Sequence, residues 1–338
     1  MVVAGRPTMR DVARAAGVGV MTVSRVINGD PRVRSGTAAR VNEAIRTLGY
    51  RRNDLASQLR RGTQSTATVG LLVDDIANPF YATLAGAVED EARRRGFIVL
   101  FGSSKEDPGR ERELLGAFCS RRIDGLVAVP AAEDTTRWVS IRAAGTPIVF
   151  VDRPAHGLDV DAVLIDGRAA ARQAAGHLLA HGHRRIGYLG DTATIWTASE
   201  RLAGYTDALA AAGLPADPAL VSQGLRSMYA AEAAAMALLS QADPVTALFT
   251  ANDVITLGAL RALRRHGRPV ALVGLDDFVL ADELTPAVTV VAQDPQAMGE
   301  TAAQLLFSRI AGDDSPRREV LLPTRLVVRG SGEIRPPT

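Results

Sequence analysis

From Thr68 onward, short apolar runs alternate with segments of mixed polarity, and this alternation constrains the fold more than any other feature of the chain. The runs "TVGLLVDD", "FIVLFGS", "IDGLVAVP" and "PIVFVDR" are apolar at most positions, and the segments between them have the apolar spacing of helices. A strand that is apolar on both faces is buried on both faces, as in a parallel sheet covered by helices. The sequence therefore predicts an α/β fold with parallel sheets.

A second series of the same kind starts at "AVLID" and includes "RIGYLGD", "ALFTAND" and "VALVGLDD". Two series in tandem predict two α/β lobes with a cleft between them. The final segments, "AVTVVAQD", "MGETAAQLLFSRIAG" and "EVLLPTRLVVRGS", predict a strand, a helix and a hairpin-like end. A chain of 338 residues has room for these lobes and one smaller domain.

The N-terminal part has a different pattern, that of a helix-turn-helix. The range Met9 to Ala16 is amphipathic and follows Thr8, whose hydroxyl is suited to cap a helix. Gly17 then allows a tight turn, because glycine tolerates positive φ. In the next segment, "MTVSRVIN", the apolar residues are three or four positions apart and share one helical face. Its polar residues are left on the other faces, available to a partner.

The charge of this N-terminal part distinguishes it from an ordinary helical hairpin. Residues 1–64 contain twelve arginines and four acidic residues, a net charge of +8. Because the whole chain has a net charge of +2, the remainder carries −6. A basic end on an acidic body is typical of a protein that binds the phosphate backbone of a nucleic acid.

The stretch "MRDVARAAGVGVMTVSRVINGDPRVRSGTAARVNEAIRTLGYRRNDLASQL" resembles the N-terminal part of the LacI/GalR family of bacterial transcription regulators. It includes a third helix over residues 36–48, and the resemblance extends over almost the whole chain. It implies a DNA-binding head over 1–50, a hinge helix and linker over 51–67, and a periplasmic-binding-protein-like effector domain over 68–338. In that domain, lobe 1 is expected over about 68–163 and 291–322, and lobe 2 over about 164–290 and 323–333.

The resemblance also assigns DNA contacts residue by residue. Thr8 and Ser24 are expected to hold phosphates, and Val20, Met21 and Arg25 to read the major groove. Val20 and Met21 suit thymine methyl groups, whereas Arg25 suits guanine. The full expected set is Thr8, Gly19, Val20, Met21, Thr22, Ser24, Arg25, Asn28, Arg32, Arg52, Asn53, Ala56 and Leu59.

Two positions depart from the family pattern, and the linker allows a second interpretation. Gly19 stands where the family usually has serine, and Arg52 where it usually has proline. Leu59 matches the leucine that wedges into the minor groove, and Ala56 matches its small partner on the second hinge helix. Without the resemblance, the same segment reads as a flexible linker.

Polar residues gather where the predicted strands end, and ligands of parallel sheets bind at those ends. Together with the resemblance, this predicts an effector site for a sugar or sugar derivative, lined by Asp75, Phe80, Asp152, Asp166, Arg201, Arg226, Asn252 and Asp276. Arg226 stands where many relatives have an aromatic residue. An Arg226 that faces the cleft favours an anionic effector, and otherwise it is a solvated surface residue.

Other chemistry finds little support in the sequence. His177, His181 and His183 lie close together, but no clear third ligand accompanies them, so we expect no metal site. Asp276 and Asp277 are adjacent, and adjacent side chains at a strand end point in different directions. The single Cys119 excludes an internal disulfide, and its apolar neighbours predict a buried thiol. We expect no cofactor and no enzymatic activity.

The sequence therefore predicts a cytoplasmic repressor that binds a pseudo-palindromic double-stranded DNA operator as a homodimer. A small effector in the cleft controls it, and no membrane is involved because no apolar run is long enough to span one. A solute-binding protein of a transporter shares the lobes but needs an export signal and has no use for a basic head. No leucine heptads follow Gly330, which favours a dimer over a tetramer.

Overall fold

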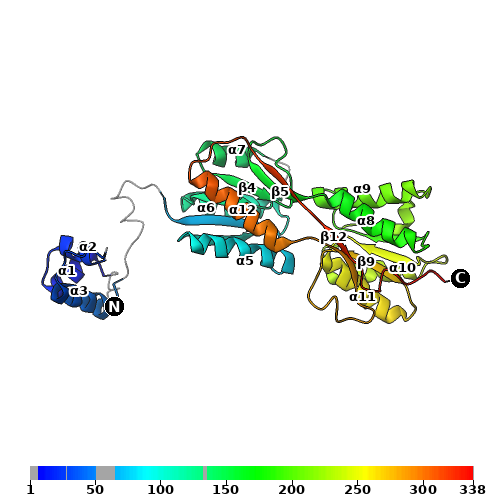
Figure 1. Ribbon diagram of the computed structural model, residues 1–338, viewed down its shortest axis with the longest axis horizontal. Helices are drawn as coiled ribbons and strands as arrows, with labels where there is room; N and C mark the ends of the chain where they lie inside the picture. The colour runs from blue at the N-terminus through cyan, green and yellow to red at the C-terminus, as the bar shows by residue number, and fades with distance from the viewer. Residues whose placement is uncertain (1–6, 28, 51–64, 132–134, 338) are drawn as a thin grey trace. The chain divides into compact units, whose positions relative to one another are not determined.

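The computed structural model describes residues 7–27, 29–50, 65–131 and 135–337 (Figure 1). The chain divides into two compact units, Met1–Thr66 and Ala67–Thr338, which we describe separately. Among the described residues, no helix combines the length and the apolar character that crossing a bilayer requires.

The first unit contains three helices, α1 (Met9–Ala16), α2 (Val20–Ile27) and α3 (Ser35–Leu48). Thr8 caps α1 by accepting a hydrogen bond from the Asp11 N–H, and the Asp11 carboxylate accepts one from the Thr8 N–H at 2.9 Å. Gly17 ends the helix with φ of 63°, in the left-handed region. The buried core of the unit consists of Val12, Ala13, Ala16, Val23, Val41 and Ala44. The predicted helix-turn-helix is therefore confirmed.

The second unit has two six-stranded sheets, each covered by helices, as the alternating pattern predicts. The first sheet has the order β11-β5-β4-β3-β1-β2 and is parallel throughout. Its strands are β1 (Thr68–Val73), β2 (Ile98–Ser103), β3 (Gly125–Ala128), β4 (Ile148–Val151), β5 (Asp161–Ile165) and β11 (Glu319–Leu322). Its helices are α5 (Pro79–Arg94), α6 (Pro108–Ser120), α7 (Thr136–Ala143) and α12 (Pro295–Ile310).

The second sheet has the order β12-β10-β9-β8-β6-β7, in which only β12 runs antiparallel to its neighbour. Its strands are β6 (Ile186–Leu189), β7 (Val221–Ser222), β8 (Ala247–Thr250), β9 (Ala271–Leu275), β10 (Thr289–Ala292) and β12 (Arg325–Val327). Its helices are α8 (Gly167–Ala180), α9 (Trp196–Ala211), α10 (Met228–Leu239) and α11 (Asp253–His266), with a short 3-10 turn at Pro218–Leu220.

The chain crosses between the two lobes three times, after β5, after β10 and after β11. As a result α12, drawn in orange, packs beside α5 although the two helices are far apart in the sequence (Figure 1). Lobe 1 therefore consists of β1 to β5, α12 and β11, together with α5 to α7.

Three sequence predictions in this unit are wrong. The segment "AVLID" forms β5 of the first sheet and does not begin the second series, so the predicted boundary after residue 163 cuts a strand. Its Asp161 is buried and receives hydrogen bonds from Arg309 and Arg318, which fix the strand in lobe 1. The C-terminal segments form no hairpin, because β11 and β12 belong to different sheets. Cys119 is exposed, since it lies one helical position beyond the buried Phe118.

Candidate functional site

The outer face of α2 carries the side chains expected to read DNA. Met21 is 71% exposed and Val20 38% exposed, while Val23 is fully buried. Arg25 is also exposed, one turn further along the helix. Gly19 begins the helix through its carbonyl, which accepts hydrogen bonds from the N–H groups of Thr22 and Val23. The helix therefore presents an apolar start and one guanidinium on its free face.

Exposed arginines occur on all three helices of the head and in the loop after α2. The exposed members that the structure describes are Arg10, Arg14, Arg25, Arg32, Arg34, Arg40 and Arg46. Arg32 already has a partner: its Nε and Nη2 donate to the two carboxylate oxygens of Asp30 at 2.9 and 2.8 Å. This pairing lowers the pKa of Asp30 to about 2. A phosphate that binds Arg32 therefore has to compete with the two hydrogen bonds from Arg32 to Asp30.

Several expected DNA contacts cannot be placed. Asn28, Arg52, Asn53, Ala56 and Leu59 lie outside the described residues, so their roles stay predictions.

The second unit has a small polar cavity where strand ends of both lobes meet. Asp74 and Asp152 follow β1 and β4 of lobe 1, and Asp191 and Asp276 follow β6 and β9 of lobe 2. The volume of the cavity is about 60 Å³. Pockets for drug-sized ligands measure roughly 300–1,000 Å³, so a ligand of that size requires the lobes or side chains to move apart.

Asp152 and Asp276 point into this cavity from unusual backbone conformations. Their φ angles are 66° and 72°, in the left-handed region that few residues other than glycine adopt. The Tyr81 hydroxyl donates to Asp152 at 3.2 Å, and the Gln293 amide donates to Asp276. Burial raises the pKa of Asp276 to about 7, although the nearby Arg201 opposes the shift. Backbone strain at functional sites is common where orientation of a side chain matters.

Arg201 supplies a cation to the cavity from lobe 2. Its side chain projects from α9, is 8% exposed, and donates through Nη1 to the Ala251 carbonyl at 2.7 Å. Its Nε and the Gln293 Oε1 are buried without a hydrogen-bond partner in the described part of the protein. One donor and one acceptor are therefore left for a ligand in the same cavity.

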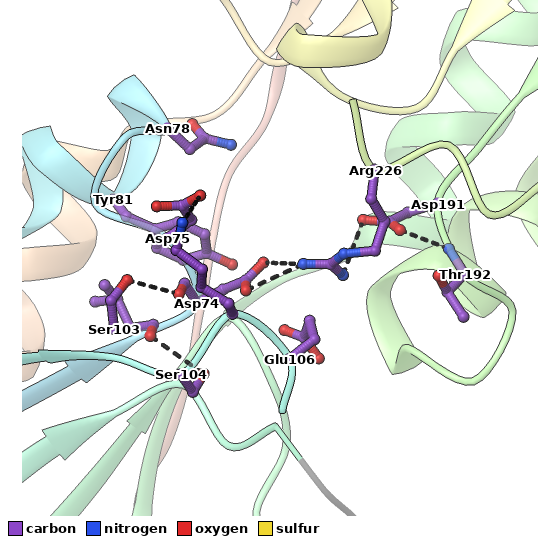
Figure 2. A network of polar contacts seen from close by, with 12 residues as sticks. Asp74, Asp75, Asn78, Tyr81, Ser103, Ser104, Glu106, Asp191, Thr192 and Arg226 are labelled. Carbon is purple, nitrogen blue, oxygen red and sulfur yellow. Dashed lines mark hydrogen bonds and ion pairs between the residues drawn. The ribbon is translucent and has the colours of Figure 1, made fainter. Parts of the chain in front are cut away.

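Arg226 connects the two lobes at the edge of the cavity (Figure 2). Its Nη2 donates to both carboxylate oxygens of Asp74, at 3.1 and 3.0 Å, and its Nη1 lies 3.6 Å from Asp191. A second contact between the lobes runs from the Asn78 amide to Asp253 at 3.3 Å. Burial raises the pKa of Asp74, and the Arg226 guanidinium counteracts that shift.

The structure separates the predicted effector residues into two groups. Phe80, Asp152, Arg201, Asn252 and Asp276 line the cavity, and Arg226 borders it. Asp75 and Asp166 do not line it: Asp75 forms an ion pair with Lys105, and Asp166 caps α8 by accepting from the Ala169 N–H.

Sequence reasoning did not select Tyr81 and Gln293, which line the cavity. Tyr81 directly follows Phe80 in the "NPFY" segment, and Gln293 directly follows β10, so both positions were detectable.

The rejected sites differ in outcome. Asp277 is held by Arg329 through two hydrogen bonds, at 2.7 and 2.6 Å, and does not line the cavity with Asp276. His183 uses both ring nitrogens, with Thr246 and the Ile334 carbonyl. The expectation that no third ligand accompanies the histidines is wrong, because Glu333 lies against His177 and within reach of His181.

A three-helix head with a basic, exposed recognition surface and a two-lobed unit with a polar cleft define a ligand-responsive DNA-binding regulator. The comparisons with known proteins agree. Residues 8–53 match the model of the lacI family of bacterial regulatory proteins, and residues 175–332 match the periplasmic binding protein-like domain. The regulator CelR of Thermobifida fusca is 38% identical over 97% of this chain and 98% of its own length. GalR of Salmonella typhimurium is 33% identical over 96% of this chain and 95% of its own length. The chain therefore belongs to the LacI family of transcription regulators.

Solved structures show the same relationship. A CelR–cellobiose complex has a TM-score of 0.72 and 36% identity, and the match covers 96% of this chain and all of the other. The lac repressor dimer bound to operator and an anti-inducer has a TM-score of 0.80 and 26% identity, over 96% and 99% of the two chains.

Proposed function

We propose that this regulator represses transcription as a homodimer on a pseudo-palindromic operator, with one α2 helix of each subunit in the major groove. The exposed face of α2 carries this proposal, because it presents Val20, Met21 and Arg25 together. Apolar side chains suit thymine methyl groups, and a free guanidinium suits the O6 and N7 atoms of guanine. In this proposal the family's hinge contacts come from Ala56 and Leu59, and the protein acts in the bacterial cytoplasm without catalytic activity.

The cleft is proposed to bind a neutral, hydroxyl-rich effector such as a sugar. Two guanidinium groups at the cleft already pair with carboxylates: Arg226 with Asp74 and Asp191, and Arg153 with Glu106. The third, Arg201, is attracted by the charge of Asp276. An anionic ligand has to displace a carboxylate to pair with Arg226 or Arg153, and at Arg201 it meets the nearby negative charge of Asp276. Hydroxyl groups instead donate to Asp152 and Asp276, and the ring of Phe80 offers an apolar surface. Cellobiose in the CelR complex is a ligand of this class.

Control is proposed to act through the contacts that connect the lobes. A ligand that binds between the lobes changes the balance between the Arg226–Asp74 contact and an opened arrangement. Operator and effector then shift the same equilibrium between two conformations of the protein. Each therefore changes the affinity of the protein for the other by the same factor.

The operator part of the proposal is tested by selecting genomic DNA fragments with the purified full-length protein. A pseudo-palindromic sequence should be enriched, and R25A should lose discrimination among its variants while R112A, which removes an exposed arginine of the second unit, should keep it. Enrichment of no sequence, with or without sugars, contradicts the proposal. Unchanged discrimination by R25A shows that Arg25 does not read bases.

The effector part is tested on the same operator with a neutral disaccharide and a sugar phosphate. We expect the disaccharide to change operator affinity in the wild type and in R168A, whose arginine lies outside the cleft, but not in R201A. A response to the phosphate alone would contradict a neutral effector, and an intact response of R201A would place the site elsewhere.

A further inference from the structure

A group of metal-ligating side chains lies in lobe 2, outside the cleft. His177 is in the last turn of α8, His181 caps the same helix, and Glu333 follows β12 in the C-terminal segment. One ligand atom from each of the three lies within 4.8 Å of the others. We propose that His177, His181 and Glu333 bind a divalent transition-metal ion of the Zn²⁺ class.

The hydrogen bond of His181 prepares its ring for coordination. Its Nδ1 lies 2.9 Å from the carbonyl oxygen of His177. A carbonyl only accepts, so Nδ1 carries the proton and Nε2 keeps a lone pair. Histidines that bind metals commonly donate their other ring N–H to a backbone carbonyl in this way. We therefore assign Nε2 of His181 as the metal ligand.

The carboxylate of Glu333 is oriented by its second oxygen. Oε2 accepts hydrogen bonds from the Thr289 hydroxyl at 3.0 Å and from the Gly330 N–H at 2.5 Å. Oε1 is then left directed at Nε2 of His177. The shorter contacts that fix the carboxylate are made to Oε2, and only the longer Thr289 contact, at 3.3 Å, reaches Oε1.

Glycine at position 332 allows the C-terminal segment to pass this close to the histidine. A Cβ on Gly332 would lie 3.0 Å from Cδ2 and 3.2 Å from Nε2 of the His177 ring. The segment is also anchored by Ser331, whose hydroxyl donates to the Leu272 carbonyl at 2.6 Å. Both sides of the site are therefore positioned by contacts that do not depend on a metal.

An ion pair between His177 and Glu333 explains those two side chains but not the third. The ring centroids of His177 and His181 lie 4.5 Å apart, so the imidazole of His181 lies next to the His177–Glu333 ion pair. The nearby His183, by contrast, has partners for both ring nitrogens and offers no lone pair. Two imidazoles and one carboxylate form a donor set typical of Zn²⁺, with room for a further ligand from solvent. Tetrahedral coordination requires ligand atoms roughly 3.4 Å apart, so metal binding requires the His177 ring and the Glu333 carboxylate, which are in direct contact here, to move apart.

The test uses tag-free, full-length protein stripped with a chelator and titrated with Co²⁺ and Zn²⁺. Co²⁺ reports its coordination directly, because a site of low coordination number with nitrogen ligands gives visible absorption bands. We expect one ion per chain in the wild type, displaced by Zn²⁺, and a higher thermal midpoint of unfolding with the metal bound. H181Q and E333Q should each weaken binding by more than about tenfold.

The matched control is H266Q, because His266 also lies in the last turn of a helix, α11, and is not part of the group. It should bind as the wild type does. Circular dichroism without metal establishes that each variant is folded. The proposal is overturned if the wild type binds no ion, or if a folded H181Q or E333Q binds with wild-type affinity. Operator binding is not needed for any of these measurements.

Discussion

Replacing Asp276 by asparagine should make the stability of lobe 2 less dependent on pH, because this carboxyl has a pKa of about 7 in the folded protein against 3.8 in its ordinary state. Above pH 7 the folded protein holds a buried charge that the unfolded chain holds in water, so the charged form of Asp276 disfavours folding. Below pH 3.8 the group is neutral in both states and this penalty is absent. The penalty therefore grows as the pH rises between these values. In D276N it is missing at every pH.

The magnitude follows from the two pKa values. Each unit of pH between them changes the free energy of unfolding by about 1.4 kcal/mol. From pH 5 to pH 8 the stability of D276N relative to the wild type should thus rise by about 3 kcal/mol, with most of the rise complete at pH 7. The attraction between the charged Asp276 carboxylate and Arg201 adds no separate effect, because it already lowers the pKa of Asp276 to the value used here.

Urea unfolding monitored by Trp196 measures this difference. Trp196 begins α9 in the same lobe as Asp276, and a W138F background removes the tryptophan of lobe 1. The control is D277N: hydrogen bonds from Arg329 lower the pKa of Asp277, so its effect should be constant between pH 5 and 8. A D276N difference that does not change with pH, or that falls as the pH rises, refutes the reasoning.

Three further predictions concern other contacts. T8A should lower the stability of the head by about 1 kcal/mol because it removes the cap of α1, whereas T8S should keep it; equal thermal unfolding of the head in T8A would contradict the capping role. R226Q should favour separation of the lobes by about 1 kcal/mol, because it removes a partly exposed ion pair between them. A radius of gyration, measured by X-ray scattering, that stays at the wild-type value would contradict this prediction. D161A should lower the free energy of unfolding of lobe 1, measured in urea, by about 3–5 kcal/mol, because Arg309 and Arg318 lose a buried partner. A decrease below about 1 kcal/mol would show that the two arginines find another partner.

Periodicity predicted most of the secondary structure, because the apolar spacing of strands and helices is a local property of the sequence. The head was predictable for the same reason, since a cap, a turn glycine and two helical faces lie within twenty residues. The sheet to which β5 belongs was not predictable in this way. That choice depends on Asp161 meeting Arg309 and Arg318, which come from residues about 150 positions later.

The cleft shows the same limit. Arg201, Asn252 and Asp276 were selected because they follow strands or match family motifs, and they do line the cavity. The partners of Arg226 required knowledge of which strand ends face each other across the lobes. The left-handed backbone at Asp152 and Asp276 has no signature in the sequence, because aspartate at a strand end usually adopts other conformations.

The three crossings between the lobes impose an order on synthesis. The first five strands of lobe 1 leave the ribosome early, but α12 and β11, which complete that lobe, are made only after the strands of lobe 2 from β6 to β10. At 5–20 residues per second, the interval between β5 and β11 is roughly 8–30 s. During that time the edge of β5 is unpaired and the apolar face that packs against α12 is uncovered. The nascent chain is therefore exposed to aggregation and to chaperone binding until its last few dozen residues emerge, and a premature stop in those residues would leave both lobes incomplete.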